Sequence, residues 1–116
     1  PEAGILAAIN KRIANILKKT SLGSETVNAD ALSEDAEAGL HRVLGELRAP
    51  VQEAAAQRRY ADGLRALVAL RAPVDEFFER IMVMDDNIER RNNRLALLRD
   101  VQILLGVVVD LSRLPG

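Results

Sequence analysis

Residues 60–98 contain all of the aromatic side chains of this chain, both of its methionines and its densest arginine cluster. Five large apolar side chains lie close together in this stretch: Phe77, Phe78, Ile81, Met82 and Met84. Burying such side chains is the main driving force for folding. Because only 3% of the residues are aromatic, aliphatic side chains must build the rest of the core. We therefore expect the chain to pack around these five residues.

The length and composition indicate one globular domain. A chain of 116 residues is long enough for one hydrophobic core and too short for two, and 48% apolar residues is ordinary for a globular protein. We expect a single domain over residues 1–116. Since the first residue is Pro1 and a helical pattern follows at once, we interpret the chain as a fragment of a longer protein.

The charge and cysteine content exclude several classes of function. A net charge of −1 gives no overall basis for nucleic-acid binding, so only a local basic patch could provide one. The absence of cysteine excludes disulfides and thiolate metal sites, and it fits a reducing cytoplasm. The longest apolar run, residues 103–109, is far too short to span a bilayer, and the sequence contains no signal-peptide pattern. We therefore expect a cytoplasmic protein with no membrane partner.

The first helical pattern covers residues 5–17, where apolar side chains recur at helical spacing. Its other face is basic, because Lys11, Asn15 and Lys18 follow one another at i, i+4 and i+7, with Arg12 and Lys19 beside them. From the sequence alone, an ordinary solvated helix face is the favoured interpretation of this charge.

Residues 20–33 are typical of a loop, and Ser33 is the predicted cap of the next helix. The apolar spacing from residue 36 to residue 57 predicts that second helix. Pro50 lies in its middle, which predicts either a kink or a break into two helices. The kink is favoured, because the apolar stripe continues in phase across the proline.

A third helix is predicted over residues 60–70, with Tyr60 on its inner face. Pro73 suits the first position of a fourth helix, because its fixed φ and missing N–H cost nothing there. Residues 85–87, Asp-Asp-Asn, then predict a turn and a helix cap.

The last helix is predicted over residues 88–111. Its second half is apolar on nearly all sides, which indicates burial against several neighbours. A strand over residues 103–109 is the alternative, because β-branched residues are frequent there. The helix is favoured, since no partner strand is visible elsewhere, and the chain is therefore predicted to be an all-α bundle of about four to five helices.

The residues needed for catalysis are missing from the sequence. His41 is the single histidine, and no Ser stands at helical spacing from it, so it is interpreted as an ordinary surface or boundary residue. Asp85 and Asp86 could bind a cation, but a helix cap is the favoured interpretation. Glycines are scattered singly, so no phosphate-binding loop exists. We expect no catalytic residue and no metal ligand in this chain.

Two function classes remain: an RNA-binding helical module and a scaffold domain that docks on other parts of a multi-subunit protein. Three motifs help to distinguish these two function classes. They are RIANILKK at residues 12–19, PVDEFFERIMVMDDN at residues 73–87 and RRNNRLALL at residues 90–98. Together they resemble the C-terminal end of the bacterial glycyl-tRNA synthetase beta subunit. The resemblance implies an all-helical anticodon-binding domain of the DALR type, which class I synthetases such as arginyl-tRNA synthetase share.

The resemblance also implies a parent enzyme of two alpha and two beta subunits, which joins glycine to its tRNA using ATP and Mg²⁺. Catalysis would lie elsewhere, and this chain would bind the anticodon loop of tRNA-Gly without a cofactor. Glycine anticodons share two cytosines, whose N4 amino groups need hydrogen-bond acceptors. The candidate tRNA-binding residues are basic or amidic and lie on the first and last helices: Lys11, Arg12, Asn15, Lys18, Lys19, Arg90, Arg91 and Arg94.

Overall fold

The structure, a computed structural model, describes residues 2–18, 27–32 and 34–108 and is all-α there, as the sequence predicts. It contains five α-helices, namely α1 (Glu2–Leu17), α2 (Asp35–Ala56), α3 (Tyr60–Leu67), α4 (Arg71–Arg80) and α5 (Ile88–Val108). Two short 3-10 segments are η1 (Ala29–Ala31) and η2 (Val68–Leu70). Residues 103–108 are helical, so the alternative of a strand there is wrong; residue 109 and the predicted end of the last helix lie outside the described residues.

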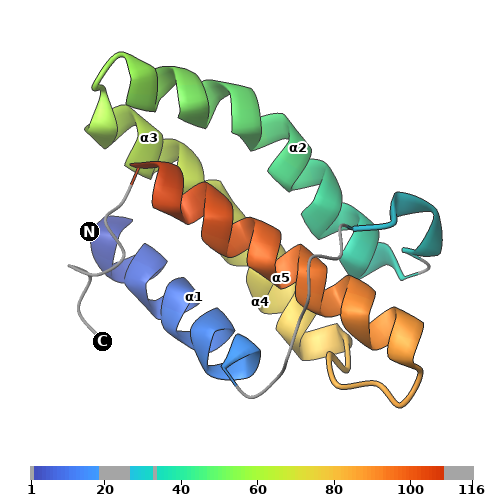
Figure 1. Cartoon of the computed structure of the whole chain (residues 1–116). Coiled ribbons are helices and arrows are strands. Elements are labelled where there is room, and N and C mark those ends of the chain that lie inside the picture. The colour runs from blue at the N-terminus through green and yellow to red at the C-terminus, as the bar shows by residue number, and fades with distance from the viewer. Residues whose placement is uncertain (1, 19–26, 33, 109–116) are drawn as a thin grey trace.

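Helix α5 is the centre of the bundle. Figure 1 shows it running antiparallel to α1 and lying between α1 and α2, with α3 and α4 following one another behind it. Its fully buried side chains point toward several neighbours and include Leu97, Leu98, Val101 and Leu105. The prediction of burial for its apolar second half is confirmed for these residues, but not for Ile103, which is 60% exposed.

Helix α2 continues through Pro50, so the alternative of a break into two helices is wrong, and the kink stays a prediction. The predicted cap, Ser33, lies outside the described residues, and Glu34 occupies the N-cap position. The backbone N–H of Glu34 donates to Oε1 of Glu37 at 3.1 Å, which satisfies one free donor at the helix start.

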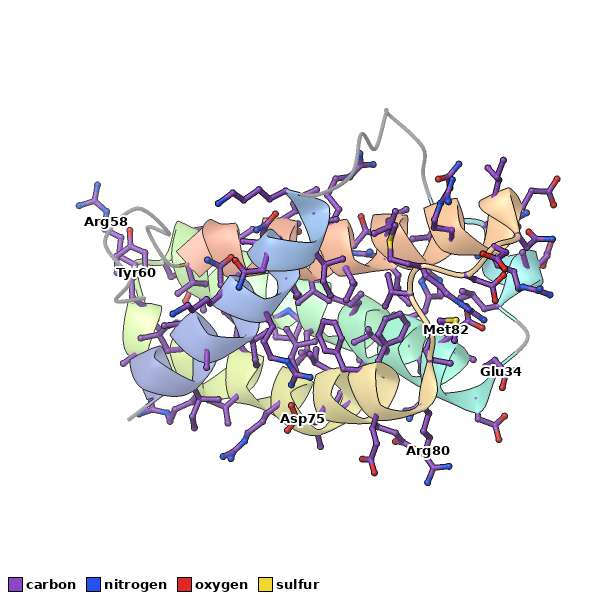
Figure 2. The ribbon with its side chains drawn as sticks, turned by 90° about the horizontal axis from the view of Figure 1, so that it is seen from below. Glu34, Arg58, Tyr60, Asp75, Arg80 and Met82 are labelled. Carbon is purple, nitrogen blue, oxygen red and sulfur yellow. The ribbon has the colours of Figure 1, made fainter. Side chains whose placement is uncertain are left out.

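The prediction that Pro73 opens a helix is wrong by two residues. The chain passes from α3 through η2 directly into α4, which begins at Arg71 and therefore has Pro73 at its third position. An N–H at this position has no partner within the same helix, so proline is tolerated there as well. Tyr60 was expected to point inward, but it is 49% exposed, because it is the first residue of α3 and lies at the end of the bundle, next to Arg58 (Figure 2).

The apolar cluster of the sequence analysis divides into buried and exposed members. Phe77 is fully buried and its ring meets that of Phe78 edge to face, with centroids 6.0 Å apart. Met82 and Met84, predicted to lie at the centre of the core, are instead 71% and 49% exposed. The reason is that α4 ends at Arg80 and Ile81 is extended.

The side chains that follow α4 alternate between the core and the solvent. Ile81 and Val83 are each only 7% exposed, whereas Met82 and Met84 point outward. Ile81 is extended and Val83 and Met84 form a turn, so the chain leaves the helical path here and only Ile81 and Val83 are directed into the core. A helical continuation would have placed the methionines differently.

Candidate nucleic-acid interface

The outer face of α1 carries the exposed side chains of Lys11 and Asn15, and the exposed Lys18 follows directly after the helix. They point outward because Leu6 and Ile13 of the same helix are fully buried on the opposite side. The predicted stripe is therefore a solvent-facing feature of the structure. Lys19 lies outside the described residues.

Arg12 is held against α4 rather than standing free on this face. Its Nη1 lies 3.1 Å from Oδ1 of Asp75, and its guanidinium carbon lies 4.3 Å from the ring centroid of Phe78. Both side chains of the ion pair are about half exposed. Arg12 therefore ties α1 to α4 while part of its charge still faces the solvent.

Arg90 and Arg91 lie in the first turn of α5. The side chain of Asn87 caps this turn, because its Oδ1 accepts the backbone N–H of Arg90 at 3.0 Å. Nη2 of Arg90 lies 3.3 Å from Oδ1 of Asp85, although the arginine side chain is still 52% exposed. Arg91 is half-buried. The predicted turn and cap at residues 85–87 are confirmed.

Arg94 is a structural residue, so its assignment to an RNA-facing surface is corrected here. Its side chain is 6% exposed, and its Nε donates to Oε2 of Glu37 at 3.0 Å. Its Nη1 donates to the carbonyl oxygen of Met82 at 2.7 Å and to Oδ2 of Asp85 at 3.4 Å. The guanidinium is thus engaged by internal oxygens, and it joins α2, α5 and the segment after α4.

The carboxylate of Asp85 is stabilised in its charged form. The backbone N–H of Asn87 donates to its Oδ1 at 2.7 Å, and this hydrogen bond is the largest cause of a lowered pKa for Asp85. Partial burial opposes the effect, and the nearby charges of Arg90 and Arg94 add to it. Asp85 therefore acts as an anionic anchor for both arginines.

Lys18, which follows the C-terminal end of α1, lies level with the first turns of α5, whereas Lys11 lies level with residues next to Gln102. Nε2 of Gln102 donates to Oδ1 of Asn10 at 3.3 Å, which fixes the register of α1 against α5. The helices run antiparallel (Figure 1), and each residue advances a helix by about 1.5 Å. Lys18, eight residues after Asn10, is therefore level with residues about eight before Gln102, one turn from Arg91.

Asn93 makes a contact that the sequence analysis did not single out. Its Oδ1 accepts the backbone N–H of Asn28 at 2.8 Å, and its Nδ2 donates to the carbonyl oxygen of Asn28 at 3.1 Å. Asn93 itself is only 7% exposed. These two bonds hold the segment before η1 against α5. Asn93 stands between Asn92 and Arg94, so the sequence gives no signal that it is buried, and its partner cannot be predicted from spacing.

The described residues contain no group of three or more His, Asp and Glu side chains that could hold a metal ion. Asp85 and Asn87 serve as turn and cap residues, and His41 is a half-buried boundary residue, as predicted. None of the helices in the described part of the chain is long and apolar enough to cross a membrane.

Comparison with known proteins gives one consistent result. Residues 6–111 match the family described as the DALR anticodon binding domain. The chain is 44% identical over 116 residues to the glycine–tRNA ligase beta subunit of Ralstonia nicotianae, 45% identical over 118 residues to that of Nitrosomonas eutropha and 46% identical over 116 residues to that of Aromatoleum aromaticum. Each match covers 100% of this chain and 16% or 17% of the relative, so the chain spans about a sixth of the length of these relatives.

Proposed function

This chain belongs to the DALR anticodon binding domain family, and we propose that it binds the anticodon loop of tRNA-Gly as a domain of a glycine–tRNA ligase beta subunit. The observation that carries the proposal is the similarity of the whole chain to one named protein, at 44% to 46% identity in three bacteria. This similarity favours tRNA binding over the alternative of a helical scaffold.

In the proposed mechanism, some side chains contact the anticodon bases and others contact the flanking phosphates. Unpaired anticodon bases expose their Watson–Crick edges to polar side chains, and cations neutralise the flanking phosphates. Lys11, Asn15 and Lys18 on α1 and Arg90 and Arg91 on α5 are exposed or half-buried and can face RNA. Arg12 takes part with the half of its side chain that Asp75 and Phe78 leave accessible. Lys19 stays in this set as a prediction from the sequence.

We place the chemistry of the enzyme outside this chain. The relatives are ligases of which this chain matches about a sixth, so the ATP and Mg²⁺ of glycine activation would bind to other parts of the enzyme. In this proposal, residues 1–116 form one C-terminal helical domain of a cytoplasmic beta subunit, which assembles with alpha subunits as two alpha and two beta chains.

A titration tests the proposal directly. A fluorescent RNA hairpin with a glycine anticodon loop, and a second hairpin with the same stem and a scrambled loop, are each titrated with the 116-residue chain. We expect the glycine loop to bind about tenfold more tightly or better, because a single good base contact already discriminates by this amount. Equal binding of the two hairpins would contradict the proposal.

A further inference from the structure

An exposed apolar surface lies at the start of α5 and in the segment before it. Three of the five large apolar side chains that are exposed in the described residues lie here: Met82 at 71%, Met84 at 49% and Ile88 at 61%. Figure 2 shows Met82 at the end of the bundle near Glu34, opposite the end that carries Arg58 and Tyr60. Clustered apolar exposure of this kind is typical of a binding surface.

The segment that carries the methionines is firmly held. Ile81 and Val83 anchor it in the core, and Nη1 of Arg94 donates to the carbonyl oxygen of Met82 at 2.7 Å. Asp85 closes the following turn through the backbone N–H of Asn87 at 2.7 Å. These contacts fix the backbone before and after Met82 and Met84, and they therefore hold both side chains outward. The surface is thus preorganised for a partner.

Polar groups of both signs stand next to this apolar surface. The guanidinium of Arg90 is oriented by Asp85 and remains half exposed. Asp86 is exposed, and within the described ranges its carboxylate forms no hydrogen bond or ion pair. Glu89 is exposed too, but it lies in the first turn of α5, where its charge complements the helix dipole. The segment thus offers an apolar contact, a cation and a free acceptor within nine residues.

We infer that Met82, Met84, Asp86 and Arg90 bind a cytosine nucleotide of the anticodon: Met82 and Met84 cover the face of the unpaired base, and Asp86 accepts a hydrogen bond from its N4 amino group. Arg90 neutralises an adjacent phosphate. This inference rests on the proposed function, in which the loop presents two cytosines.

The chemistry of the three groups suits an RNA base. Methionine is flexible and polarisable, and it adapts to a flat π surface. It supplies the apolar contact that aromatic side chains provide in other single-strand readers, and this chain has few of those. A carboxylate selects cytosine, because cytosine presents an amino donor where uracil presents a carbonyl acceptor. An apolar protein partner would leave the carboxylate of Asp86 unpaired on binding.

The first experiment removes the apolar contact. The double variant Met82→Ser/Met84→Ser and the control Ile103→Ser are titrated with the glycine-loop hairpin. Ile103 is 60% exposed, so the control also removes an exposed apolar side chain, but from the second half of α5. We expect about a tenfold loss of affinity in the double variant and less than a twofold change in the control. The side chains are exposed, so the melting temperatures of both variants should stay close to that of the wild type.

The second experiment tests the base itself. Asp86→Asn and the matched control Glu89→Gln each replace one exposed carboxylate by an amide. We expect the wild-type chain and the Glu89 variant to prefer two cytosines over two uracils in the loop. Asp86→Asn should reduce this preference about tenfold, because the amide can donate to uracil O4 as well as accept from cytosine N4.

Three outcomes would overturn the inference, and they differ in whether the proposed function also fails. If the wild-type chain binds the glycine loop and the scrambled loop equally, the proposed function fails as well. If the wild-type chain discriminates the two loops but the methionine variant behaves like Ile103→Ser, only the reading surface is wrong. If the methionine variant retains RNA affinity and instead loses association with the rest of the beta subunit, the surface is a protein contact.

Discussion

Nε of Arg94 on α5 donates to Oε2 of Glu37 on α2 at 3.0 Å, and both side chains are almost completely buried. The two residues are 57 positions apart in the sequence. Oε1 of the same carboxylate accepts the N–H of Glu34, and Nη1 of Arg94 donates to the carbonyl oxygen of Met82. One ion pair therefore joins the start of α2, the middle of α5 and the methionine segment.

Arg94→Met should lower the free energy of unfolding by about 3 to 5 kcal/mol, because it leaves the buried carboxylate of Glu37 without its counter-charge. Chemical denaturation measures this loss. The matched control is Arg42→Met, which breaks an exposed pair with Glu46 on one face of α2 and should cost less than about 1 kcal/mol. Equal losses in the two variants would show that burial of the Arg94 pair has no energetic consequence.

The pKa of Asp85 should lie below the ordinary value of 3.8, since the N–H of Asn87 and the charges of Arg90 and Arg94 favour the carboxylate. A folded-state pKa below the unfolded one adds stability above the unfolded value, and this stability is lost as the pH falls through the folded value. The contribution of Asp85 should therefore be fully present above about pH 4 and be lost progressively as the pH falls below it. An NMR titration of the Asp85 carboxyl carbon measures the pKa, and Arg90→Gln should raise it. A wild-type midpoint above 4 would contradict the assignment.

Phe77→Ala should cost about 3 to 5 kcal/mol of stability, because the ring is fully buried and its removal leaves a cavity. Phe78→Ala should cost less, since this ring is half-buried and stands between Phe77 and the guanidinium of Arg12. Thermal and chemical denaturation of the two variants compare these losses. A larger loss for Phe78 would mean that the contact with Arg12 outweighs core burial.

Gly63→Ala should lower stability by about 1 to 2 kcal/mol, although alanine is normally the better helix residue. A Cβ at Gly63 would come within 2.8 Å of Cγ2 of Val108, so the valine side chain or the two helices would have to shift. Gly45→Ala is the control, because nothing lies within 4 Å of a Cβ at that position of α2. It should raise stability by up to about 1 kcal/mol. Stabilisation by both alanines would show that the contact at Gly63 is loose.

Lys18→Glu should weaken binding of the glycine-loop hairpin several-fold and reduce the slope of log affinity against log salt by about 0.7 or more, because one phosphate contact is lost. Fluorescence anisotropy at several salt concentrations measures both quantities. Arg58→Glu is the matched charge reversal and should change neither, because Arg58 lies at the end of the bundle opposite Met82 and Glu34 (Figure 2). A common decrease in both variants would indicate a general charge effect rather than a contact at Lys18.

Local patterns predicted the helices well, but they could not predict where α4 would end. The apolar spacing of α1, α2 and α5 sets the inner face of each helix, so the burial of Leu6, Leu44 and Val101 was readable from the sequence. The end of α4 at Arg80 was not, because residues 81–84 continue an apolar run that also fits a helix. The exposure of Met82 and Met84 follows from the end of the helix at Arg80 and the turn at residues 83–84.

The candidate interface was likewise predictable from the sequence only in part. The outward face of α1 follows from helical spacing, and Lys11 and Lys18 are exposed as that spacing requires. Arg90 and Arg94 are four residues apart and look equivalent in the sequence, yet one is half exposed and the other is buried. Their environments depend on Glu37 and Asp85, which come from other parts of the chain.

The sequence by itself determined the all-α class, the inner faces of the helices and the family of this chain, because these depend on residue type and spacing along one segment. Only the tertiary structure decided which arginines face the solvent and which apolar residues stay outside the core. The physical reason is that a charge is buried only where a distant partner compensates it, and such partners are brought together by the packing of α2 and the segment after α4 against α5.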